Sequence, residues 1–248
     1  MKNVNSDMAY DYIRKRILNG EYGPGNALMT ESLSAEIGVS RTPVRDALRQ
    51  LESDGLVSIR PRLGASVKQM NVKEFREMCD LRLALESHAA GLAAVNRHEA
   101  DLHEIEFALE AMRRLNVAIL AAPQEEPLIA ELVKEDVRFH VAIMSAAKND
   151  LMKKEILRLH LINRVVSGPA GGQRPVMKKS DRDIRRQAVL DSHDEIYAAI
   201  ARSDAQAAKQ AMERHIQDII DGSMRSMARA ESGLIARELT TDEMSYGL

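Results

Sequence analysis

Three arginines recur at every fourth position of one short segment. They are Arg41, Arg45 and Arg49, and the apolar positions between and after them are Val44, Ala47, Leu48 and Leu51. Residues four apart share one side of a helix, so these arginines would line one edge of an apolar stripe. A short helix fits the DNA major groove, and Arg pairs with guanine edges and with phosphates. The spacing alone is equally typical of a solvated basic face.

A second group of chemically active residues interrupts three apolar helical stripes farther along the chain. Asp136 and His140 stand four apart in one stripe, and His193 and His215 lie in two later ones. Such inward groups must pair, form hydrogen bonds or bind a metal, because burying an unpaired charge is costly. Three imidazoles and a carboxylate suit a divalent ion such as Zn²⁺, Ni²⁺ or Mn²⁺. The pattern is about as typical of core histidines satisfied by an Asp–His hydrogen bond.

The residues around the arginines predict a helix-turn-helix. Gly38 permits a tight turn, Ser40 is the predicted N-cap, and Pro43 stands in the first helical turn, where a missing N–H is harmless. An amphipathic helix that ends near Gly20 and a short helix at 30–37 precede this turn. The arginines therefore lie on the third of three helices.

A basic hairpin follows the third helix. Two apolar runs, at 56–59 and 65–67, enclose a turn that contains Arg62 and Gly64. The glycine permits the turn, and the arginine could reach phosphates or the minor groove. Three helices and a two-stranded wing predict a winged helix-turn-helix DNA-binding domain over residues 1–70.

Composition limits the class of protein. The chain has 248 residues, of which 45% are apolar and only 3% aromatic, so it can form a sizeable and mainly helical core. Its single cysteine, Cys79, excludes an internal disulfide and fits a reducing cytoplasm. No signal peptide and no apolar run of membrane-spanning length is present. We therefore expect a cytoplasmic protein with no membrane partner.

Charge is distributed unevenly but mildly. Residues 1–70 carry 10 basic and 8 acidic side chains, and residues 71–248 carry 25 and 29. The N-terminal part is therefore net +2 and the rest net −4. Local placement of arginines, rather than bulk charge, must account for DNA binding.

An all-helical domain is predicted after residue 70. Asn71 and Glu74 have the spacing of a capping box at its start. The predicted helices are 72–97, 99–121, 127–147, 150–167, 181–202 and 204–230. The Gly- and Pro-containing stretch from Ser167 to Lys179 predicts a flexible loop or a lid over a cavity. Periodicity fades over 231–248, which predicts a frayed tail after a domain that spans 71–230.

The N-terminal motifs resemble a known family. Gly-Val-Ser-Arg-Thr-Pro-Val-Arg at 38–45, Leu-Glu-Ser-Asp-Gly-Leu-Val at 51–57 and the wing glycine are similar to the DNA-binding domain of GntR-family bacterial transcription regulators. The resemblance implies that the operator-contacting positions are Ser40, Arg41, Thr42, Arg45 and Gly64. The helical spacing adds Arg49 to this set, and the wing adds Arg62.

The C-terminal motifs resemble the FadR-type, or FCD, branch of that family. They are Asp-Val-Arg-Phe-His at 136–140, Ser-His-Asp-Glu-Ile at 192–196 and Met-Glu-Arg-His-Ile at 212–216. In many members the matching residues hold a divalent metal inside a helical bundle. The resemblance therefore implies a metal site formed by Asp136, His140, His193 and His215.

Contacts to an effector are predicted from one inward arginine. Arg82 lies on an apolar helical stripe, and an Arg beside a metal suits a carboxylate, which can also coordinate the ion. An ion pair with Glu86, four residues later, is an equally good interpretation. Asn163 and Arg164 are further candidates. We expect the remaining histidines to be structural or exposed; they are His88, His98, His103 and His160.

Together these features predict a dimeric transcription regulator rather than an enzyme. We expect a repressor that binds a pseudo-palindromic double-stranded DNA operator as a homodimer. A small organic acid bound at the metal would release it. Two alternatives are a metal-dependent enzyme with a DNA-binding appendage and a constitutive DNA-binding dimer without an effector.

Overall fold

The N-terminal region is a small helical domain with a three-stranded sheet. The computed structural model describes residues 4–166 and 178–235. Its first elements are α1 (Val4–Leu18), β1 (Ala27–Leu28), α2 (Thr30–Ile37), α3 (Arg41–Ser53), β2 (Val57–Arg60) and β3 (Gly64–Val67). The sheet order is β1-β3-β2, so the predicted two-stranded wing is joined by one more strand. That strand has only two residues, too few to produce an alternating pattern in the sequence.

The turns of this domain occur where the glycines predicted them. Gly38 caps the end of α2 with φ 75°, a left-handed conformation that costs glycine little. The wing turn is closed by the pairing of Arg60 with Gly64 in antiparallel register. Within that turn Arg62 has φ 68° and Gly64 has φ 86°. The two turns thus set the direction in which α3 and the wing leave the domain.

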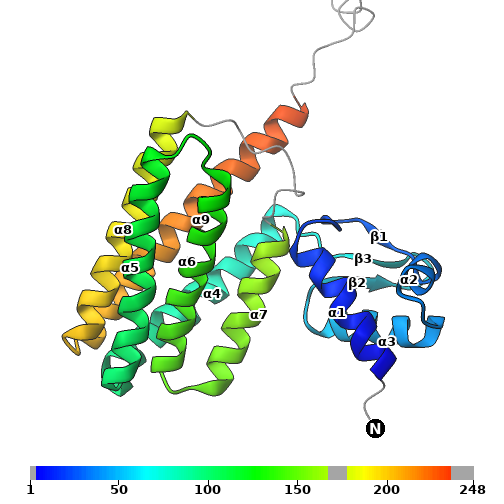
Figure 1. The fold of residues 1–248 in the computed structure, drawn as a ribbon, viewed down its shortest axis with the longest axis horizontal. Helices are drawn as coiled ribbons and strands as arrows, with labels where there is room; N and C mark the ends of the chain where they lie inside the picture. The colour runs from blue at the N-terminus through cyan, green and yellow to red at the C-terminus, as the bar shows by residue number, and fades with distance from the viewer. Residues whose placement is uncertain (1–3, 167–177, 236–248) are drawn as a thin grey trace, which may run out of the picture.

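The C-terminal region is a bundle of long helices (Figure 1). They are α4 (Val72–Asn96), α5 (Glu99–Ala121), α6 (Glu126–Ala146), α7 (Asp150–Val166), α8 (Lys179–Ala201) and α9 (Ala205–Ile235). The predicted capping box is present: Asn71 accepts from the Glu74 N–H, and Glu74 accepts from the Asn71 N–H. The last helix runs five residues beyond its predicted end. The predicted lid lies almost entirely outside the described residues, and so does most of the predicted frayed tail.

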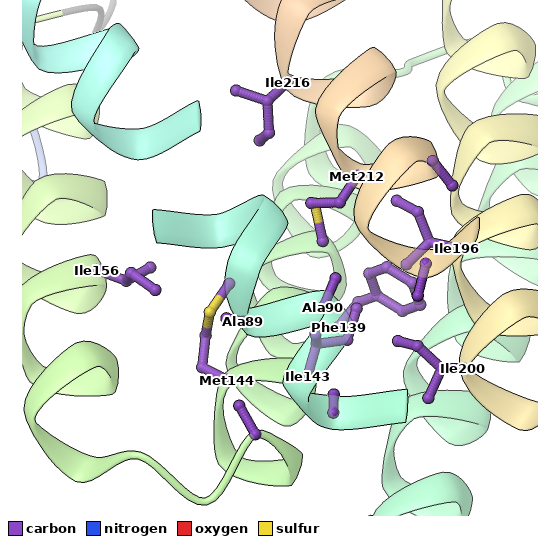
Figure 2. Close-up of a cluster of buried hydrophobic side chains, with 14 of the residues drawn as sticks. Ala89, Ala90, Phe139, Ile143, Met144, Ile156, Ile196, Ile200, Met212 and Ile216 are labelled. Atoms are coloured by element: carbon purple, nitrogen blue, oxygen red, sulfur yellow. The ribbon is translucent and has the colours of Figure 1, made fainter. Parts of the chain in front are cut away.

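The bundle encloses a core of aliphatic residues, methionines and one phenylalanine (Figure 2). Phe139 on α6 packs among Ile196 and Ile200 of α8 and Met212 of α9, and all four are fully buried. Ala90, on α4, keeps that helix close to the others because its side chain is small. Side chains of α6, α8 and α9 thus meet in this core, and these are the helices that carry the predicted metal ligands.

Helix α7 connects the two regions (Figure 1). Its Val165 is 4% exposed and belongs to the hydrophobic cluster of the N-terminal domain, whereas Ile156 and Ile162 belong to the bundle core. Ile162 also lies against Gly55, directly after the recognition-helix candidate α3: a Cβ added to Gly55 would stand 2.6 Å from Ile162 Cδ1. One rigid element is therefore part of both cores.

In the described ranges of the chain, no helix combines the length and the apolar composition that crossing a membrane requires.

Candidate functional site

The exposed side of α3 carries the residues predicted to contact DNA. Its inner side is buried through Val44, Leu48 and Leu51 against α1 and the sheet. Ser40, Arg41, Thr42, Arg45 and Arg49 are all exposed. Ser40 is the N-cap residue as predicted, yet its side chain makes no capping hydrogen bond. Its hydroxyl is thus available at the helix N-terminus, where N–H groups and the dipole favour a phosphate.

The three arginines of α3 differ in their partners. Arg41 donates to Glu31 of α2 at 2.5 Å, and Arg49 lies 3.6 Å from Asp46. Among the described residues Arg45 has no ion pair. Surface pairs such as these contribute little to stability, so DNA phosphates could displace them. Arg45 could contact DNA without first giving up a carboxylate partner.

The turn of the wing is exposed as well. Arg62 and Gly64 are exposed at its turn, as is Leu63 at 79%. The left-handed backbone of Arg62 turns the chain sharply between the two strands. A side chain at a hairpin tip can reach a groove or a phosphate beside the recognition helix.

Three of the four predicted metal ligands meet inside the bundle. His140 on α6, His193 on α8 and His215 on α9 are at most 3% exposed, and one ring nitrogen of each lies within 4.8 Å of the other two. The Nε2 atoms of His193 and His215 are 3.3 Å apart. Two nitrogens held tetrahedrally at ~2.0–2.1 Å from Zn²⁺ would be about 3.3 Å apart. The spacing therefore fits a single divalent ion.

Asp136 approaches this group from the side. Its Oδ1 lies 3.6 Å from His193 Nε2, and its side chain is 39% exposed. Position 136 thus supplies the only carboxylate among the four predicted ligands, at the edge where the buried histidines meet a cavity. It stands one helical turn before His140, a spacing that places both residues on the same face of α6.

Electrostatics keeps two of the imidazoles neutral. Burial, together with the neighbouring His215 and His140, holds the pKa of His193 well below its usual range. Burial and His140 lower the pKa of His215 to about 3. Neutral imidazoles offer the lone pairs that a metal requires.

Ser192 orients one of these rings. Its Oγ donates to the Val189 carbonyl at 2.6 Å and lies 2.7 Å from His215 Nδ1. Because the hydroxyl proton is already used, the ring must donate from Nδ1. This leaves the lone pair of His215 on Nε2, facing His193. Hydrogen bonds of this kind fix the tautomer of metal-binding histidines.

A second buried cluster orients His140. Glu86 of α4 is fully buried, with Oε2 3.4 Å from His140 Nδ1 and Oε1 3.1 Å from His160 Nε2. Arg82 donates to the same carboxylate at 2.8 Å. Burial alone would raise the pKa of Glu86, but Arg82 and His160 hold it well below the ordinary value. Burial likewise opposes protonation of His140, yet Glu86 and Asp136 raise its pKa.

Sequence reasoning missed the centre of this second cluster. Arg82 does point inward and pairs with Glu86, as one of the two interpretations expected. The sequence predicts Glu86 only as that partner, and it predicts His160 to be structural or exposed. A fully buried Arg–Glu pair within an apolar helical stripe was the available signal. No signal in the sequence indicates the contact between Glu86 and His160, because it depends on how α7 packs against α4.

A cavity of about 250 Å³ opens beside Asp136. Its walls come from α5, α6, α8 and α9 and are mostly apolar. They consist of Met112, Asn116, Leu132, Val133, Asp136, Arg186, Val189, Leu190 and Ile219. The three residues predicted to contact an effector stand elsewhere: Arg82 is buried against Glu86, Arg164 is exposed on α7, and Asn163 is partly exposed there.

Family models match both halves of the chain. Residues 5–67 match the model described as bacterial regulatory proteins, gntR family, and residues 77–218 match the FCD domain. The two matches correspond to the winged helix-turn-helix and to most of the helical bundle.

Individual relatives agree with these models. The HTH-type transcriptional regulator LutR of Bacillus subtilis is 30% identical over 83% of this chain and 94% of its own length. The Uxu operon transcriptional regulator of Escherichia coli is 30% identical over 84% and 82%, and the transcriptional repressor RspR of the same species is 27% identical over 92% of each.

Solved structures share the fold. McbR/YncC of E. coli superposes with a TM-score of 0.64 at 20% identity, covering 89% of this chain and 99% of its own. A GntR-type protein from Rhodococcus gives 0.64 at 23% identity, covering 89% and 97%. The chain therefore belongs to the GntR family of bacterial regulatory proteins, with an FCD domain, and is a DNA-binding transcription regulator rather than an enzyme.

Proposed function

We propose that this regulator is a repressor that binds a pseudo-palindromic operator as a homodimer and is released by a small carboxylate bound at a divalent metal. The observation that carries the proposal is the meeting of three buried imidazoles with Asp136 beside a cavity. Such a centre provides what a metal-dependent effector site needs: imidazole ligands, a carboxylate and space for a small molecule.

On DNA, α3 would lie in the major groove. Arg45 would contact a base, with Ser40, Arg41, Thr42 and Arg49 on bases or backbone nearby. Arg62 and Gly64 of the wing would contact phosphate or the minor groove. A two-fold dimer would place two such helices about 34–36 Å apart, one helical turn of DNA.

In the bundle, Asp136, His140, His193 and His215 would hold Zn²⁺, Ni²⁺ or Mn²⁺. The ion would supply a positive charge to which an organic acid can coordinate. Glu86 and Ser192 would keep two of the rings in the orientation and tautomer that ligation requires. Arg82, Asn163 and Arg164 remain predicted effector contacts, although Arg82 already pairs with Glu86.

Helix α7 offers a route from the metal to the DNA-binding domain. His160 contacts Glu86, the partner of His140, while Ile162 and Val165 pack on the other domain. An effector that displaces α7 would shift the recognition helix, because α7 is part of both cores. A coupling of ~1–3 kcal/mol would change operator affinity roughly five- to 150-fold.

Metal analysis tests the proposed centre. Protein purified without chelator should contain about one divalent ion per chain. His193→Ala should lose that ion, whereas His103→Ala, at an exposed histidine outside the centre, should retain it. Full occupancy in His193→Ala would show that the ligands are assigned wrongly.

DNA selection tests the repressor model. Sequences selected from a random library should contain two inverted half-sites separated by about one helical turn. Small organic acids should weaken binding to the selected DNA only when the metal is present. Release that does not depend on metal would contradict the proposed effector site.

A further inference from the structure

We propose that the cavity beside Asp136 binds a small dicarboxylic acid, with one carboxylate at the metal and the other on Arg186. This inference rests on the proposed metal-dependent function and specifies the ligand class of that same site. Arg186 and Asn116 were not among the predicted site residues, and they are the polar groups that line the cavity besides Asp136.

The lining residues of the cavity are spread along α6 and α8. Arg186 precedes the metal ligand His193 on α8 by seven residues, which is two helical turns or about 10 Å. Between them on the same helix, Val189 and Leu190 line the wall. Leu132, one turn before Asp136 on α6, extends the cavity in the same way. Arg186 and the proposed metal ligand His193 are therefore two helical turns apart on α8, with the apolar wall residues Val189 and Leu190 between them in the sequence.

Arg186 is built into this wall. Its side chain is 13% exposed, its Nε donates to the Asn116 Oδ1 at 3.1 Å, and its NH2 pairs with Asp183. Asn116 is 5% exposed and donates to Gln187 at 2.8 Å. A guanidinium has five N–H donors, and these bonds use two of them within the described residues. The remaining donors suit a carboxylate, which Arg can bind in bidentate fashion.

The volume limits the size of the ligand. A cavity of 150 Å³ accommodates benzene, so a cavity of about 250 Å³ has room for roughly ten non-hydrogen atoms. A six-carbon dicarboxylic acid such as adipic acid has this size. Its methylene chain would lie against the apolar walls, where a carboxylate in the middle of the ligand would lose its solvation without gaining a partner. Nucleotides and long acyl chains are too large.

A pair of matched acids tests the second carboxylate. With the zinc-loaded full-length protein, we expect adipate to bind more tightly than hexanoate, which has the same chain and a single carboxylate. Affinity is measured by calorimetry. Arg186→Gln should reduce adipate affinity by roughly ten- to 100-fold, the range of a hydrogen bond to a charged group, and leave hexanoate affinity unchanged. Unchanged hexanoate binding also shows that the variant is folded.

Two controls separate the possible failures. Arg182→Gln removes a charge one turn earlier on α8, where Arg182 pairs with Glu125 at the surface, and should leave adipate binding intact. Arg186→Lys should restore part of the affinity. Equal binding of adipate and hexanoate, insensitive to Arg186→Gln, would overturn this inference and leave the metal-dependent function standing. If neither acid binds the zinc-loaded protein, the carboxylate-effector function itself is refuted.

Discussion

Shortening Val165 to alanine should weaken the packing of the DNA-binding domain on the bundle. The side chain projects from α7 into the N-terminal hydrophobic cluster and is 4% exposed. Val57, in strand β2, is 2% exposed in that same cluster but belongs to the DNA-binding domain itself. Val→Ala at either position therefore removes the same two methyl groups from the same hydrophobic core. Only Val165→Ala also weakens the link to the bundle.

Both variants should lose similar amounts of stability. Each removes two methyl-sized groups from a buried site, worth about 0.8 kcal/mol apiece by transfer. The cavity left behind raises the cost to about 2–3 kcal/mol for the opening of the domain. Amide hydrogen exchange in α3 should then accelerate roughly 30- to 150-fold in either variant.

The response of α3 to zinc distinguishes the two variants. In the unmodified protein, zinc added after chelation should slow exchange in α3, because an ion bound at the proposed site would stabilise the bundle and with it the α7 surface on which the domain packs. In Val57→Ala, zinc should slow exchange in α3 by the same factor as in the unmodified protein. In Val165→Ala, most of this slowing should be lost. If zinc protects α3 equally in both variants, the metal does not act on the DNA-binding domain through α7.

Three further outcomes follow from the site geometry. Arg45→Ala should weaken binding to selected operator DNA by about 1–3 kcal/mol and relax the base preference at one symmetric position. If the variant binds the operator as tightly as the unmodified protein at both low and high salt, Arg45 does not contact a base. Glu86→Gln should lower zinc affinity by roughly ten- to 100-fold, as measured by competition with a chelator, because the carboxylate that orients the proposed ligand His140 is lost. Metal-free protein should lose stability as pH falls below about 6.5, since the lowered pKa values of His193 and His215 mean that only the unfolded chain takes up their protons. His193 and His215 each contribute about 1.4 kcal/mol of this loss per pH unit. His140 opposes the trend through its raised pKa. Urea unfolding at pH 7 and pH 5 measures the net change in the free energy of unfolding. Stability that is constant between those pH values would show that these histidines are not buried as neutral groups.

Local features of the sequence determined most of the fold. Helix periodicity, the capping box at Asn71 and the turn at Gly38 each depend on residues within a few positions of one another. Inward positions on single helices could be inferred in the same way, so the burial of Arg82, His140, His193 and His215 was predictable. The two-residue strand β1 was not, because its only reason to be extended is its pairing with β3.

The tertiary structure alone decided which inward residues meet. Side chains on different helices come together through the packing of those helices, and no spacing along the chain encodes that packing. Glu86 thus joins His140 to His160, and Asn116 of α5 joins Arg186 of α8, across 70 residues of sequence. The burial of Val165 in the neighbouring domain has the same origin. A helix shows in its own sequence which face is apolar, but the partner of that face is determined by the fold as a whole.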